Sequence, residues 1–125
     1  MEIKVSTHGP FFTLGARPLV DAVHDTVQEL VIEGERRVGL QLYPGHGLIT
    51  GHYKRSVHGE MTDSLHGRVH DSNVVYGPWL EGTSSRNKTT RFRGYAMFRR
   101  ATQQLDRLKG GVLAKHVARA IARLN

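Results

Sequence analysis

The chain has 125 residues, a length that suits one domain, and its 38% hydrophobic and 23% charged residues indicate a globular protein. It has no cysteine, which excludes disulfides, thiolate zinc sites and cysteine nucleophiles. Eighteen Lys and Arg against eleven Asp and Glu give a net charge of +7, which would attract nucleic acid or an acidic protein surface. No apolar run approaches the ~20 residues that span a bilayer, and the first residues lack the order of a secretory signal. We therefore expect no membrane partner and synthesis in a cytoplasm.

The start of the chain predicts a short edge strand and then a long helix. Ile3 to Val5 alternate with polar residues, and Gly9-Pro10 ends this pattern. Arg17-Pro18 is typical of a helix start, because proline is tolerated in the first turn. We expect the helix to continue through Gly34, at about 1 kcal/mol relative to alanine, and to end at Tyr43-Pro44-Gly45. Its apolar stripe consists of Leu19, Val23, Val27, Leu30, Val31, Val38 and Leu42.

The middle third of the chain alternates with a period of two, which favours β-strands. Residues 52–58 and 64–70 each place polar side chains on one face, and residues 59–63 supply a turn between them. Asp71-Ser72-Asn73 predicts a second turn, and Val74 to Tyr76 a third short strand. The sequence therefore predicts an α+β fold, in which the long N-terminal helix packs on a small antiparallel β-meander and a C-terminal helix follows.

The last third returns to a helical pattern from Tyr95 onward. The offset between two apolar stripes coincides with Gly110-Gly111, so we expect a kink or a break there. The first stripe holds Ala101, Leu105, Leu108 and Val112, and the second holds Leu113, Val117, Ile121 and Leu124. Residues 112–125 also carry a basic face of Lys115, Arg119 and Arg123. This segment is either a surface helix with cations near its C-terminus or a helix that docks on a partner.

Catalytic and metal-binding patterns are weak. Four of the eight histidines, His52, His58, His66 and His70, lie on the polar faces of the predicted strands. Three imidazoles with a carboxylate or water can hold zinc, but no His-Glu-x-x-His sequence occurs, and we expect these histidines to face solvent. The chain also has no Gly-x-Ser-x-Gly sequence and no Gly-Lys-Ser/Thr phosphate loop. We expect no metal site, no cofactor and no enzymatic activity.

The segment from Val75 to Ala101 has the most unusual order of residues. Tyr76, Pro78 and the chain's only Trp, Trp79, supply rigid apolar area that suits either a core corner or an interface. The lone acid of the segment, Glu81, could accept hydrogen bonds from backbone amides of the loop that follows it, or pair with Arg91 or Arg93. If Glu81 acts at an interface, Glu81→Gln should leave folding intact and impair assembly. Residues 83–90 contain no large apolar side chain and should form a loop that is mobile when unpartnered. The basic cluster of the segment comprises Arg86, Lys88, Arg91, Arg93, Arg99 and Arg100.

This segment resembles the signature region of neck and tail-completion proteins of long-tailed bacteriophages. The similar residues run Tyr76-Gly77-Pro78-Trp79-Leu80-Glu81-Gly82-Thr83, followed by Phe92, Phe98 and Ala101 at the start of the last helix. The resemblance is closest to versions encoded by phages of actinobacteria, in which Gly9-Pro10-Phe11-Phe12 also recurs. The segment departs from the usual pattern at two places. Gly82 follows Glu81 directly in the sequence, where many members have an aromatic residue between them, and Arg91 precedes Phe92 where a proline is usual.

The resemblance implies a structural virion protein that joins the DNA-filled head to the tail as a subunit of a neck ring, with six copies. Implied partners are the neighbouring connector or stopper and tail-tube proteins, and the implied location is the virion neck or tail, assembled in the host cytoplasm. Candidate subunit-interface residues are Tyr76, Trp79, Glu81, Arg91, Phe92 and Arg93. Candidates for contact with packaged DNA or an acidic partner are Arg86, Lys88, Arg99 and Arg100. Two alternatives stay open: a tail terminator that caps the tail tube, and a small basic nucleic-acid-binding protein.

Overall fold

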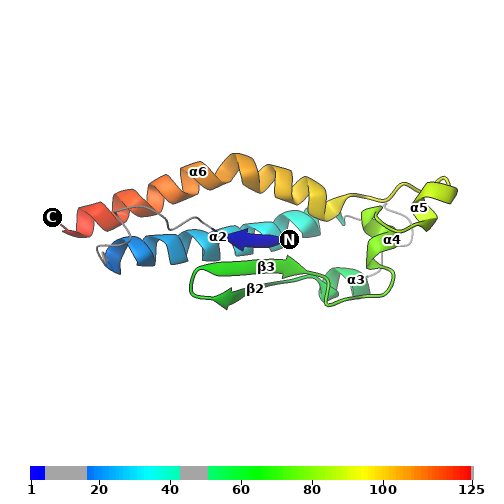
Figure 1. Ribbon diagram of the computed structural model, residues 1–125, viewed down its shortest axis with the longest axis horizontal. Coiled ribbons are helices and arrows are strands. Elements are labelled where there is room, and N and C mark those ends of the chain that lie inside the picture. Colours follow the sequence, from blue (N-terminus) through cyan, green and yellow to red (C-terminus); the bar gives the residue numbers. More distant parts are fainter. Residues whose placement is uncertain (5–16, 43–50, 125) are drawn as a thin grey trace.

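The computed structural model describes residues 1–4, 17–42 and 51–124 and has the predicted α+β fold. Figure 1 shows a long central helix with a second long helix along one side and a hairpin along the other. The elements are β1 (Glu2–Lys4), α2 (Arg17–Gln41), α3 (Gly51–Ser56), β2 (His58–Asp63), β3 (His66–His70), α4 (Gly77–Glu81), α5 (Arg86–Thr89) and α6 (Met97–Leu124). The predictions made for Val5, residues 9–12, residues 43–45 and Asn125 lie outside the described residues.

The central helix α2 confirms the predicted long helix and its apolar stripe. It begins at Arg17 and continues through Gly34 to Gln41. Gly34 is buried, and a Cβ on it would come within 2.8 Å of Met1 Cε, 3.1 Å of Val69 Cγ2 and 3.2 Å of Leu105 Cδ1. The glycine therefore lets the sheet and α6 approach α2 closely, which offsets its low helix propensity. The predicted stripe residues Leu19, Val23, Val27, Leu30, Val31, Val38 and Leu42 are all buried.

The sheet is antiparallel and three-stranded, but it is not the predicted meander. Its order is β1-β3-β2, so the N-terminal strand lies at one edge beside β3. Ile3 pairs with Gly67, and Gly59 pairs with Val69. Met1 extends the pairing of β1, because its carbonyl accepts the Val69 N–H at 2.9 Å. The predicted edge strand is confirmed, and β1 supplies the third strand that was expected from residues 74–76.

The predicted strand at residues 52–58 is wrong, because most of it forms the short helix α3. Tyr53 and Val57 are buried, whereas Lys54 and Arg55 are exposed. A strand would have placed Arg55 on the same face as Tyr53 and Val57. Helical spacing instead brings Tyr53 and Val57 together on one side and leaves Lys54 and Arg55 in solvent. In the last turn of α3, these two positive charges also interact favourably with the helix dipole.

Two further strand predictions are wrong by position. Residues 60–63, expected as part of a turn, belong to β2, and the hairpin turns at Ser64-Leu65, where Asp63 Oδ1 accepts the Leu65 N–H at 2.8 Å. Residues 74–76 form turns rather than a strand. The preceding turn at Asp71 to Asn73 is confirmed, and Ser72 and Asn73 adopt left-handed φ values of 61° and 58°. This reversal directs the chain toward α4 and leaves Val75 94% exposed.

The C-terminal helix α6 runs unbroken through Gly110-Gly111, so of the predicted kink or break, the break is absent. Figure 1 shows instead that the ribbon of α6 bends as it passes along α2. Ala101 and Leu105 are buried as predicted, whereas Leu108 is 36% and Ile121 45% exposed. Near its C-terminal end, the helix packs through Ala120 against a small cluster on α2 that contains Leu19 and Ala22.

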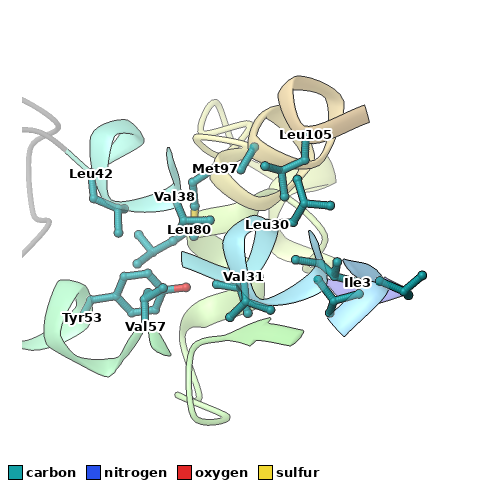
Figure 2. Close-up of a cluster of buried hydrophobic side chains, with 14 residues drawn as sticks. Ile3, Leu30, Val31, Val38, Leu42, Tyr53, Val57, Leu80, Met97 and Leu105 are labelled. Carbon is teal, nitrogen blue, oxygen red and sulfur yellow. The ribbon is translucent and has the colours of Figure 1, made fainter. Parts of the chain in front are cut away.

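The main core joins all layers of the fold. Figure 2 shows the ring of Tyr53 from α3 near Leu80 of α4 and Val38 of α2, while Met97 and Leu105 enter the same cluster from α6. Trp79, Phe92, Tyr95 and Phe98 pack partly buried against this cluster. The segment that carries the family resemblance therefore packs against the core through these aromatic side chains.

Candidate functional site

Residues 77–99 form a compact unit at one end of the molecule, which we call the clasp. It comprises α4, α5 and the first turn of α6, and Figure 1 shows these three elements together at the end opposite the C-terminus. The clasp contains most of the candidate site residues that the sequence indicated. Its internal contacts decide which of those side chains are used within the chain and which remain on the surface.

Glu81 caps the N-terminus of α6 from a different element. Its carboxylate oxygens accept the backbone N–H groups of Phe98 at 2.9 Å and Arg99 at 3.0 Å. The first N–H groups of a helix have no partner within the helix, and a negative charge there also offsets the positive end of the helix dipole. Because α6 has no acidic residue in its own first turn, this contact supplies what the local sequence lacks.

Two glycines allow the backbone of the clasp to cross itself. Gly82 follows the end of α4 with φ 103°, and Gly94 has φ 91°. A Cβ on Gly82 would collide with the Arg93 carbonyl, and a Cβ on Gly94 would collide with the backbone of Gly82. The Tyr95 N–H donates to the Leu80 carbonyl at 2.6 Å, and the Ala96 N–H donates to the Glu81 carbonyl at 3.2 Å. The crossing therefore places Glu81 directly beside the start of α6.

Asn87 holds the middle of the clasp and was missed by the sequence analysis. Its side chain is buried, Nδ2 donates to the Trp79 carbonyl at 3.1 Å and the Phe92 carbonyl at 3.0 Å, and Oδ1 accepts the Ser84 N–H at 3.0 Å. An asparagine in a polar segment has no sequence signal that distinguishes this role. Residues 83–90, expected to be a loop, contain the one-turn helix α5 around this residue; their mobility stays a prediction.

The aromatic residues of the clasp pack mainly on one another. The Trp79 and Phe92 rings lie 4.8 Å apart and the Phe92 and Tyr95 rings 5.1 Å apart, both edge to face. Such pairs stabilise a fold beyond the area that they bury. Tyr76 lies outside this group, with its ring 5.7 Å from that of Tyr53. Of the predicted interface residues, Trp79 and Phe92 thus serve the clasp itself, while Tyr76 is 42% exposed.

The arginines predicted to accompany Glu81 do not pair with it. Arg91 and Arg93 are exposed, and Arg93 Nη1 donates to the Asn87 carbonyl at 2.8 Å. Arg86, Lys88, Arg99 and Arg100 are exposed as well. Within the described ranges, none of these six side chains forms an ion pair with a carboxylate. The six cations that the sequence grouped together therefore lie on the surface of the described chain without a carboxylate partner.

A second polar contact supports the turn that leads into α4. The buried Tyr53 hydroxyl donates to Asp71 Oδ2 at 3.0 Å, and burial, followed by this bond, raises the pKa of Tyr53 well above its ordinary range. Asp71 Oδ1 also accepts the Asn73 N–H at 3.0 Å. The carboxylate thereby joins α3 to the left-handed turn before the clasp.

Two histidines of the hairpin contact carboxylates, and the rings of His58 and His70 lie 6.5 Å apart, edge to face. His66 Nδ1 lies 2.8 Å from Asp63 Oδ1, and His70 Nε2 lies 3.3 Å from Glu60 Oε1. Over residues 1–4, 17–42 and 51–124, no three His, Asp or Glu side chains gather so that they could hold a metal ion. In the same ranges, no helix has the length and apolar character required to cross a membrane.

Lys115 of the predicted docking helix is engaged within the chain. Its ammonium lies 2.6 Å from Glu29 Oε1 of α2, and His116 Nε2 lies 3.7 Å from the other oxygen of the same carboxylate. Arg119 and Arg123 are exposed on the same helix.

Comparison of the chain with protein-family models, with curated proteins and with solved structures gives no match.

Proposed function

We propose that this chain is a structural virion protein, a subunit of the neck ring that joins the DNA-filled head of a long-tailed phage to its tail. The proposal rests on the resemblance carried by Val75 to Ala101. In this role the chain acts by assembly and not by catalysis, and its neighbours are copies of itself and the adjoining connector and tail-tube proteins.

The observation that best supports the proposal is that the residues of the resemblance form one unit. Leu80 enters the core, Glu81 caps α6, Gly82 makes the left-handed turn, and Phe98 lies in the first turn of α6. A pattern whose members depend on one another is a stronger basis for family resemblance than scattered identities. The same unit leaves Val75 and Tyr76 exposed beside it, as an assembly contact would need.

A closed ring requires two different surfaces that fit each other, because each subunit contacts the next in a head-to-tail manner. Val75 and Tyr76 form one exposed apolar area, and Ile32 and Leu40 of α2 form a second one. Together with Lys54 and Val57 these two residues line an open hollow of about 700 Å³. Two separate apolar areas of this kind support a head-to-tail contact.

The decisive experiment introduces an amber codon into the gene in the phage that encodes this chain and examines lysates by electron microscopy. Separate DNA-filled heads and tails of normal length would support the joining role. Tails of uncontrolled length would assign the chain to the tail terminator instead. Normal infectious particles would overturn the virion assignment.

A further inference from the structure

We propose that the basic end of the molecule, formed by Arg86, Lys88, Arg91, Arg93, Arg99 and Arg100, binds the sugar-phosphate backbone of duplex DNA without reading its sequence. The inference rests on the charges of the chain and does not depend on the neck role. We call this set of six side chains the basic end.

The acids of the chain are largely engaged within it. Nine of the eleven carboxylates accept a hydrogen bond or form an ion pair inside the chain, which leaves only Glu2 and Asp25 without such a contact in the described ranges. The nine are Asp21, Glu29, Glu33, Glu35, Glu60, Asp63, Asp71, Glu81 and Asp106. A second copy therefore offers few free acids to the basic end, and the partner that neutralises it is a different molecule.

The placement of Arg99 and Arg100 opposes the stability of the clasp. Arg99 and Arg100 stand in the first turn of α6, where the helix dipole is positive and acidic residues are favoured. Arg86 and Lys88 lie in α5, which Asn87 ties to the same end. Like charges so gathered repel one another, and residues that break a local rule without structural benefit are typical of functional surfaces. An anionic ligand would remove this repulsion.

The basic surface continues along the outer side of α6. Arg100, Gln103 and Arg107 follow at helical spacing and are all exposed. Seven residues at ~1.5 Å each separate Arg100 from Arg107 by about 10 Å along the helix axis. Five of the six side chains of the basic end are arginines, whose planar guanidinium groups match phosphate oxygens in pairs. An extended row of such groups fits a repeating polyanion.

The aromatic residues decide between duplex and single-stranded nucleic acid. Proteins that bind single strands stack bases on free aromatic faces. Here Trp79, Phe92 and Tyr95 are half-buried and pack edge to face on one another. These three rings are committed to the clasp and offer no free face to a base, which favours backbone contacts to a duplex.

The test measures fluorescence anisotropy of a labelled 20-base-pair duplex of arbitrary sequence as the full chain is added, at several salt concentrations. If all six side chains contact phosphates, the slope of log K against log salt is about −5, and affinity falls roughly 10³-fold between 50 and 200 mM salt. The triple variant R86Q/R91Q/R100Q should lose about half of this slope. Its matched control, K4Q/R119Q/R123Q, removes three exposed cations from β1 and from the far end of α6, whose side chains also make no ion pair among the described residues, and should keep the slope.

Four results would overturn the proposal. They are no binding at 50 mM salt, an equal loss of slope in the control variant, tighter binding of the corresponding single strand, and displacement of the duplex by poly-glutamate at equal charge concentration. The last of these would assign the basic end to an acidic protein. Unfolding curves of both variants, followed by circular dichroism, verify that neither loses its fold. Failure here leaves the neck role standing, and failure of the phage experiment leaves DNA binding standing.

Discussion

The carboxylate of Glu81 accepts the backbone N–H of Phe98 at 2.9 Å and so links the end of α4 to the start of α6. The contact joins residues 17 positions apart and gives a structural role to the acid that is most prominent in the sequence pattern. The interface role that the sequence suggested for Glu81 predicted intact folding after removal of its charge. The capping contact leads to a different expectation.

Glu81→Gln should lower the free energy of unfolding by about 1–2 kcal/mol, because an amide has one acceptor oxygen for two backbone donors and no charge for the helix dipole. Hydrogen exchange of the Phe98 and Arg99 amides should become faster than in the parent chain. The matched control is Glu2→Gln, since Glu2 is exposed and its side chain forms no hydrogen bond or ion pair among the described residues. Unchanged exchange at both amides would contradict the capping role.

Asn87→Ala should destabilise the clasp by roughly 2–4 kcal/mol, because the Trp79 and Phe92 carbonyls and the Ser84 N–H lose their partner in a buried place. Trp79 is the chain's only tryptophan, so its fluorescence reports on the clasp directly. We expect red-shifted emission at denaturant concentrations where circular dichroism still shows the long helices. The exposed Gln103→Ala serves as control and should leave both signals in place.

Two glycine-to-alanine changes should act in opposite directions. Gly82→Ala should destabilise the fold by more than about 2 kcal/mol, because φ is 103° and the new Cβ would meet the Arg93 carbonyl. Gly110→Ala should stabilise it by about 0.5–1 kcal/mol, since Gly110 is helical and a Cβ there meets nothing within 4 Å. Thermal unfolding measures both. A stabilising Gly82→Ala would show that the crossing with Gly94 is not as tight as described.

Glu33 should make stability fall in acid. Hydrogen bonds from Arg36, and then from Arg37, lower the pKa of Glu33 from 4.5 to about 2 against the opposing effect of burial. Because the folded-state pKa is the lower one, the ionised carboxylate stabilises the fold above about pH 5, and this contribution is lost as the pH falls toward 2. For a surface ion pair we expect about 1 kcal/mol.

Unfolding by urea at pH 6 and pH 2.5 measures this effect, with Glu33→Gln expected to show a smaller difference between the two pH values. The difference should not vanish, because Arg68 also lowers the pKa of Glu60, and the Leu65 N–H lowers that of Asp63. An equal pH dependence in the parent chain and in Glu33→Gln would refute the prediction.

The long helices were predictable because their signals are local. The apolar stripe from Leu19 to Leu42 has helical spacing over seven turns, and Pro18 stands where a helix begins. The short elements were not predictable in the same way. Residues 52–58 alternate as a strand would, but a strand would bury Arg55 with Tyr53 and Val57, whereas the helix leaves Arg55 in solvent.

The candidate site shows the same division. The sequence singled out Val75 to Ala101 as a unit and placed the cations of the basic end in it. It could not show that Glu81 reaches the amides of Phe98 and Arg99, or that Asn87 is the buried centre. These contacts depend on the crossing of Gly82 and Gly94, which no periodic pattern encodes.

The sequence by itself determined the α+β class, the span of the N-terminal helix, the presence of a C-terminal helix, the edge position of the first strand and the excess of positive charge, because these follow from composition and from spacing along the chain. Only the tertiary structure decided the strand order, the helical state of α3 and which charged groups remain free. Those properties depend on contacts between residues far apart in sequence, such as Ile3 with Gly67 and Glu81 with Phe98, and the energy of such contacts exceeds the local preferences of short segments.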